Sequence, residues 1–149
     1  MAGPGPFVLY NDFKSNLGKK LIDLSADTFK MALFTSASIA INAAVTPATY
    51  GSFAADANEV ANGNGYTTAG VSCGAGSWTG TSTQTFDVAD ATWTASGAGF
   101  TARAAVLYDS TPATKYAVAY CLLDSTPANV SVAAANTLTL QIANVLTLT

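Results

Sequence analysis

The chain contains no histidine and only six basic and nine acidic residues among its 149. Catalysis by a serine or cysteine nucleophile normally requires an adjacent base, most often histidine. The absence of histidine therefore excludes the usual catalytic triads and every histidine-based metal site. Soluble monomers also rely on surface charge. A chain with so little charge and a mean hydropathy of +0.31 is expected to be covered by copies of itself or by a larger assembly.

Long hydrophobic runs are also lacking. The longest apolar stretch, residues 116–123, is far shorter than the roughly 20 residues of a membrane span, so no membrane insertion is predicted. The first residues lack the basic and apolar regions of a secretory signal, so synthesis in the cytosol is expected. Cys73 and Cys121 are then expected to be reduced and buried as small apolar residues. A disulfide between them is the alternative if their strands are neighbours.

Positive charge is scarce and unevenly distributed. The net charge of −3 argues against a nucleic-acid partner. Four of the six basic residues lie within the first 30 positions, namely Lys14, Lys19, Lys20 and Lys30. Two interpretations remain open: a solvated helix face, or an end of the molecule that docks on an acidic partner.

Paired carboxylates are the remaining candidates for chemistry. The two pairs are Asp56 with Glu59 and Asp87 with Asp90. Acid–base catalysis needs two carboxyl groups that face one pocket, which a three-residue spacing in loops does not provide. Capping of turns is the expected role. No calcium-binding loop and no glycine-rich phosphate loop is present, so the sequence predicts no catalytic residue, no metal, no cofactor and no enzyme activity.

The chain is expected to form one domain, residues 10–149, preceded by a flexible arm. Residues 1–9 are rich in glycine and proline and are predicted to become ordered only when something binds them. Apolar residues recur every three or four positions from Tyr10 to Leu24, which predicts a helix. Because Gly18 interrupts this pattern, a helix that ends near Gly18 is the alternative.

The remaining chain alternates short apolar segments with turn residues. Strands are predicted at 29–35, 67–73, 83–94 (one strand or a broken hairpin), 100–108, 116–123, 137–142 and 145–149. Residues 36–66 are predicted to form a long functional loop that is mobile in the free protein. The sequence Asp-Ser-Thr-Pro occurs twice, starting at Asp109 and at Asp124, and predicts two similar turns. Together these features predict an all-β fold, an antiparallel β-sandwich or jelly-roll-like barrel with a short N-terminal helix.

The two tryptophans are predicted to differ in role. Trp93 follows a strand pattern and is expected in the core. Trp78 lies in a turn rich in glycine, serine and threonine, so an exposed ring could stack on a sugar or anchor an interface. The alternative is a cap over one end of the sandwich.

Three segments resemble a family of small structural proteins of tailed bacteriophages, often encoded among head genes. They are residues 10–33, residues 58–71 and residues 90–109, with Trp93 and the strand that ends at Asp109 in the third. The resemblance implies a capsid decoration (cement) protein, a homo-oligomer bound to the major capsid protein on the virion surface. The candidate interface residues are Tyr10, Lys14, Lys19, Lys20 and Trp78. A tail or baseplate component and a glycan-binding adhesin module are the alternatives.

Overall fold

A computed structural model describes residues 2–149, and Met1 lies outside the described residues. Strands make up 38% of the chain and helices 9%, which confirms the prediction of an all-β, sandwich-like fold. The elements are, in order, β1 (Val8–Leu9), α1 (Asn11–Gly18), β2 (Thr28–Phe34), α2 (Tyr50–Ala55), β3 (Val71–Ala75), β4 (Ser77–Gly80), β5 (Gln84–Asp87), β6 (Ala91–Thr94), β7 (Phe100–Ala102), β8 (Ala104–Asp109), β9 (Ala117–Leu122), β10 (Val130–Val132), β11 (Thr137–Leu140) and β12 (Leu146–Leu148).

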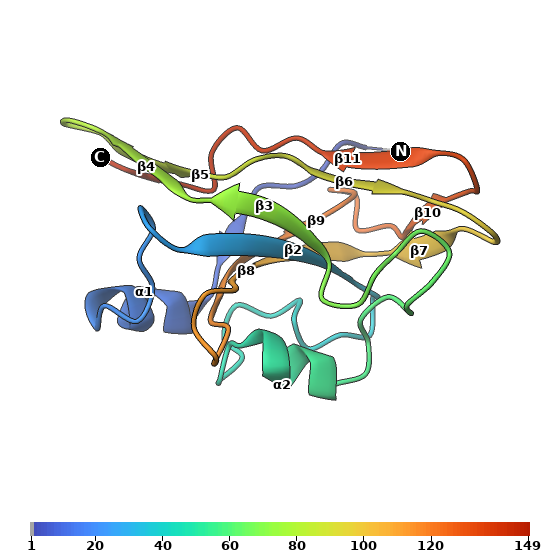
Figure 1. The fold of residues 1–149 in the computed structure, drawn as a ribbon, viewed down its shortest axis with the longest axis horizontal. Coiled ribbons are helices and arrows are strands. Elements are labelled where there is room, and N and C mark those ends of the chain that lie inside the picture. The colour runs from blue at the N-terminus through green and yellow to red at the C-terminus, as the bar shows by residue number, and fades with distance from the viewer. Residues whose placement is uncertain (1) are drawn as a thin grey trace.

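The centre of the molecule is a five-stranded antiparallel sheet in the order β1-β9-β8-β2-β3. All six residues of β8 are buried, as expected of an apolar run that is covered on both faces. Figure 1 shows α1 and α2 on one side of this sheet and the shorter strands β4, β5, β6 and β11 on the other. The central strands therefore lie between two covering layers.

The second layer consists of three small antiparallel sheets, β12-β5-β4, β11-β6 and β10-β7. It packs on the central sheet through aromatic rings such as Phe29 and Phe86, whose centroids are 5.1 Å apart. Trp93 is buried, as predicted. The outer face instead carries exposed cross-strand hydroxyl pairs: Thr92 with Thr139, Thr94 with Thr137, and Thr101 with Ser131, at oxygen–oxygen distances of 3.3, 3.2 and 2.8 Å.

Several predicted strands have different boundaries in the structure. The run predicted at 100–108 is broken at Arg103 into β7, which pairs with β10, and β8, which pairs with β2 and β9. The Arg103 backbone N–H donates to Phe34 O at 2.8 Å, and its side chain bonds to Asn129 and Pro127, so the chain passes from one layer to the other there. The segment 83–94 likewise divides into β5 and β6, which have different partners.

Helix α1 ends at Gly18, so the shorter of the two predicted helices is confirmed. Phe13 is buried under the sheet, but Leu21, expected on the same face, is 40% exposed. The chain reverses after the helix, where Lys20 adopts a left-handed backbone conformation with φ 58°. The Asp12 carboxylate accepts the Ala48 backbone N–H at 3.0 Å, which ties α1 to the segment that follows β2.

Residues 36–66 are not the open loop that the sequence predicts. They contain α2, which begins with a capping box between Thr49 and Ser52. Phe53 is fully buried, with its ring centroid 5.4 Å from that of Tyr10 and 6.1 Å from that of Phe34. Because this contact anchors the segment to the core, the structure gives no support to the predicted mobility.

The N-terminal arm also contacts the domain. Val8 and Leu9 form β1 and pair with β9, and the Gly5 backbone N–H donates to Leu122 O at 2.9 Å. The physical reason is that the edge of β9 offers free backbone groups that an extended segment can pair with. The arm is therefore paired with the sheet at Gly5, Val8 and Leu9, while its flexibility in the free protein stays a prediction.

Both cysteines are free and buried, as expected of small apolar residues. Cys73 lies on β3 and Cys121 on β9, and β2 and β8 separate these strands in the sheet. The alternative of a disulfide between neighbouring strands is therefore wrong. Burial raises the pKa of both thiols to about 12, so neither is a reactive thiolate.

Candidate functional site

Of the five predicted interface residues, two line the same groove and one is buried in the core. Tyr10 is fully buried, and its hydroxyl donates to Ala40 O at 2.6 Å, so the prediction that it forms an interface is wrong. Lys14, Lys19 and Lys20 are exposed. Trp78 is half-buried on β4 and lines the same groove as Lys20. The basic helix end and this tryptophan therefore belong to one side of the molecule.

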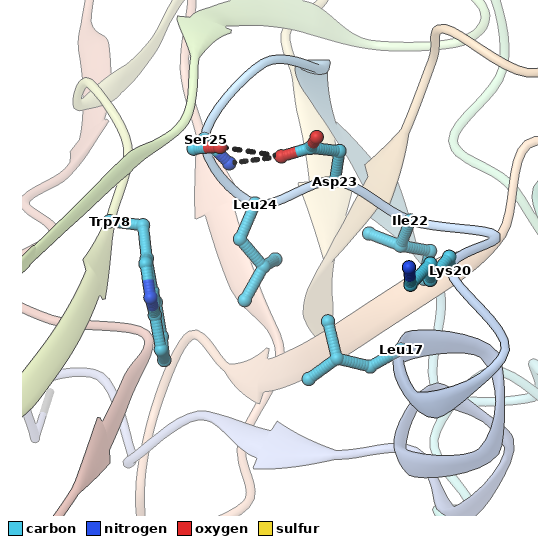
Figure 2. Close-up of a pocket in the computed structure, with 7 residues that line it drawn as sticks. All are labelled: Leu17, Lys20, Ile22, Asp23, Leu24, Ser25 and Trp78. Atoms are coloured by element: carbon cyan, nitrogen blue, oxygen red, sulfur yellow. Dashed lines mark hydrogen bonds between the residues drawn. The ribbon is translucent and has the colours of Figure 1, made fainter.

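This groove, here called the Trp78 groove, has a volume of about 540 Å³. It is lined by Leu17, Lys20, Ile22, Asp23, Leu24, Ser25 and Trp78. Figure 2 shows the indole ring on one side of the groove, the aliphatic side chains of Leu24 and Leu17 beside it, and Lys20 at the far end. The groove has an apolar floor, one cation, Lys20, and one carboxylate, Asp23, which accepts hydrogen bonds within its own turn. Lys20 is therefore the groove residue that suits an acidic group of a ligand, and the floor suits its apolar groups.

One wall of the groove is a turn closed by Asp23. Its carboxylate accepts the backbone N–H groups of Ser25 at 2.9 Å and Ala26 at 3.1 Å, and also the Ser25 hydroxyl at 2.6 Å. These bonds lower the pKa of Asp23, the Ser25 hydroxyl having the largest effect. The turn packs against Gly76, where a Cβ atom would collide with Leu24 O, so only glycine allows this close approach.

A carboxyl pair lies directly behind this turn. Asp109, at the end of β8, is fully buried, and its Oδ1 accepts the Thr111 backbone N–H at 2.9 Å. Its Oδ2 is also buried and has no hydrogen-bond donor among the described residues. Burial is the largest cause that raises the pKa of Asp109; together with the adjacent Asp27 carboxyl group, and against the lowering effect of the Thr111 N–H, it brings this pKa to about 7. Asp27 Oδ2 in turn accepts the Asp23 backbone N–H at 2.7 Å.

The two Asp-Ser-Thr-Pro turns share a backbone hydrogen bond but differ in their side-chain contacts. In both, the aspartate accepts the backbone N–H two residues later, Thr111 or Thr126, each at 2.9 Å, as predicted. The Thr126 hydroxyl also donates to Asp124 at 2.6 Å, and these bonds lower the pKa of Asp124. No second carboxyl group contributes to that shift, whereas Asp27 faces Asp109. Sequence analysis predicted the turns but not the carboxyl pair.

The two carboxylate pairs singled out in the sequence make separate structural contacts. Asp56 accepts the Ile39 backbone N–H at 2.9 Å, and this bond is the main cause that lowers its pKa. Asp87 accepts the N–H of the next residue at 2.9 Å, and Asp90 accepts that of Ile142 at 2.7 Å. Backbone capping, the predicted role, therefore describes three of the four.

Glu59 is the exception, because it binds side chains. It accepts the hydroxyl groups of Tyr50 at 2.8 Å and Tyr66 at 2.6 Å, and the Ala69 backbone N–H at 2.7 Å. Burial, with the hydrogen bond to Glu59 as the next cause, raises the pKa of both tyrosines. These contacts hold residues 50–69 together, and the Leu33 backbone N–H, which donates to the Tyr66 hydroxyl at 3.1 Å, joins the segment to β2.

Comparison of the chain with protein-family models, with curated proteins and with solved structures finds no match in any of the three. Within residues 2–149, no group of three or more histidine, cysteine, aspartate or glutamate side chains is placed to hold a metal ion. No helix in this part of the chain is both long and apolar enough to cross a membrane. The functional proposal is therefore based on the exposed lysines and the Trp78 groove.

Proposed function

We propose that the protein is a capsid decoration (cement) protein of a tailed bacteriophage, which stabilises the head shell by binding the major capsid protein as a homo-oligomer. One observation supports this best: Lys20 and Trp78 line one groove, and Lys14 in α1 and Lys19 just after it are exposed. We call these lysines and the Trp78 groove the docking end. The three sequence segments that resemble phage head proteins are the second support.

The docking end suits a partner surface that presents apolar and acidic side chains. Each exposed ion pair contributes only about 0–1 kcal/mol, so the lysines alone bind weakly. The aliphatic and aromatic groove residues add burial of apolar area. Repetition over a symmetric shell then makes a modest contact per copy sufficient to reinforce the particle.

Replacing Lys14, Lys19 and Lys20 with glutamine is expected to lower the occupancy of the protein on decoration-free phage heads. The loss should be largest at low salt, because exposed charges are screened within roughly 8 Å at physiological ionic strength. The measurement is the number of copies bound per particle over a salt series, by quantitative gel analysis or electron microscopy.

Single-charge variants provide the matched control. Lys20→Gln removes one charge from the docking end, whereas Lys115→Gln removes one from a lysine whose ammonium lies 5.4 Å from the centre of the Tyr50 ring. Only the first is expected to reduce occupancy. Equal occupancy for the triple-lysine variant and the native protein at every salt concentration would show that this end does not dock through charge.

Self-association is the second expected property. Val8, Leu21, Ile39 and Leu148 are large apolar residues that are 37–48% exposed on a chain with little charge. With so few charges to keep copies apart, association between copies is expected to cover such residues. Light scattering at micromolar concentration is expected to give a mass above that of the 15.1 kDa chain. A stable monomer would contradict the homo-oligomer.

A glycan-binding module is the second candidate, favoured by the position of Trp78 beside the polar groups of Asp23 and Ser25. An aromatic face with nearby hydrogen-bonding groups is a common sugar site. Binding to a glycan array that is lost in Trp78→Ala, together with few copies at one vertex of the particle, would favour this candidate. A tail or baseplate component would also show few copies, but no glycan binding.

A further inference from the structure

The Asp27–Asp109 pair joins the Trp78 groove to the centre of the fold. Asp109 Oδ2 is buried and lacks a donor among residues 2–149. A buried ionised carboxylate is costly when one of its oxygens has no donor, even though the Thr111 N–H binds the other oxygen. A proton on Asp109 removes this cost, because the protonated carboxyl group donates to the Asp27 carboxylate. Two carboxyl groups in one site commonly hold a single proton in this way.

We propose that Asp109 holds a proton that it donates to the Asp27 carboxylate, and that the loss of this proton displaces the turn at residues 23–27, so that the docking end loses affinity for an acidic partner as pH rises. This inference assigns a regulation to the docking end and rests, for its biological meaning, on the proposed function. The structural step can be tested without any partner.

The hydrogen bonds of the turn connect the Asp27 carboxyl group to the wall of the Trp78 groove. Asp27 is held by its carboxylate to the Asp23 backbone N–H at 2.7 Å, and its own N–H donates to Asp23 O at 3.0 Å. When both carboxyl groups are ionised they repel each other, and Asp27 is the less buried of the two. A movement of Asp27 therefore carries Asp23, Leu24 and Ser25, which form one wall of the groove.

Among residues 2–149, no positive side chain contributes to the pKa shift of Asp109. In the β2–β8 register Phe29 lies opposite Asp109 and Lys30 opposite Tyr108, so Lys30 points to the other face of the sheet. Lys115, in the β8–β9 connection, lies over the Tyr50 ring. The other titratable groups on neighbouring elements are Asp23 in the turn, Cys73 on β3, Asp87 on β5, Tyr108 on β8 and Tyr116 before β9. The proton on Asp109 is thus the means by which the pair avoids two adjacent negative charges.

The experiment is an NMR titration of the full chain from about pH 5 to about pH 9. It follows the backbone amide signals of residues 23–25, the indole N–H of Trp78 and the carboxyl carbon of Asp109. In the native protein all of these signals are expected to shift together, in one step near the pKa of Asp109. In Asp109→Asn, whose amide donates to Asp27 at every pH, the groove signals are expected to remain constant.

A second variant keeps the test decisive if Asp109→Asn does not fold. Asp27→Asn places an amide donor beside Asp109, so the carboxyl carbon of Asp109 is expected to titrate at a lower pH. Groove signals that stay constant in the native protein, or that titrate equally in Asp109→Asn, would overturn the proposal. So would an unchanged Asp109 titration in Asp27→Asn.

Binding to decoration-free heads then separates the two proposals. The native protein is expected to bind fewer copies at about pH 8 than at about pH 6, whereas Asp109→Asn binds equally at both. If neither protein binds at either pH, the docking function is wrong, and the NMR titration still decides whether the pair reshapes the groove. If both bind with the same pH dependence, the carboxyl pair does not regulate docking.

Discussion

Replacing Asp109 with asparagine is expected to flatten the dependence of stability on pH between about pH 4 and pH 7. In the native protein the pKa of Asp109 is raised to about 7, whereas an aspartate in an unfolded chain titrates near pH 3.9. Between these values the folded chain holds a proton that the unfolded chain has lost. The free energy of unfolding therefore falls as pH rises, by up to about 1.4 kcal/mol per pH unit. The variant is expected to be more stable than the native protein at about pH 8.

The aspartates with lowered pKa values have the opposite effect. Asp23, Asp56 and Asp124 stabilise the fold above their unfolded pKa, and this stabilisation is lost as pH falls through their folded values. Native stability is therefore expected to be greatest between about pH 4 and 5. Urea unfolding followed by tryptophan fluorescence across this range measures the profile.

Asp124→Asn is the matched control, because it makes the same aspartate-to-asparagine change at the same position of the second Asp-Ser-Thr-Pro turn. This variant is expected to lose stability at neutral pH, because the lowered pKa of the native Asp124 indicates that the fold favours its ionised form. The two asparagine variants should therefore change stability in opposite directions. If Asp109→Asn had the same pH slope as the native protein, Asp109 would not hold the proton.

Replacing Phe53 with alanine is expected to lower the free energy of unfolding by about 3–5 kcal/mol. The ring is fully buried between Tyr10 and Phe34, so its removal leaves a cavity where α2 meets the central sheet. If residues 36–66 were a mobile loop, the same substitution would have little effect. Urea unfolding at fixed pH measures the difference.

Ile39→Ala is the control for this substitution. Ile39 belongs to the same segment but is 43% exposed, so its truncation is expected to change stability by less than about 1 kcal/mol. Similar losses in the two variants would show that Phe53 is not the anchor of the segment.

The strands that could be predicted are those whose apolar run is continuous and bounded by turn residues. Residues 104–109 and 117–122 satisfy both conditions, and they form the β8–β9 hairpin. The break at Arg103 could not be predicted, because it depends on a bond to Phe34, 69 positions away in the sequence (103 − 34 = 69). Helix α2 was missed because six residues are too few to show a helical period, although the pair Thr49 and Ser52 was a local signal.

The candidate site was predictable only in part. A cluster of lysines and a tryptophan in a glycine-rich turn can be recognised from short stretches of sequence. Two of these residues, Lys20 and Trp78, do line one groove. The position of Tyr10 depends on Ala40, which accepts its hydroxyl, and on the ring of Phe53. The Asp27–Asp109 pair depends on the register between β2 and β8. Sequence patterns carry no direct signal for such distant contacts.

The hydroxyl pairs on the outer face of the second layer determine how this face responds to pH and salt. Threonine and serine side chains on β6, β11, β7 and β10 face solvent without charge. Hydroxyl groups do not titrate in the ordinary pH range, and salt does not screen them, so the hydration of this face is the same in acid and in brine. The proposed docking end carries exposed lysines whose interactions weaken as salt rises, whereas this hydroxyl face keeps its hydration over the same range of salt and pH.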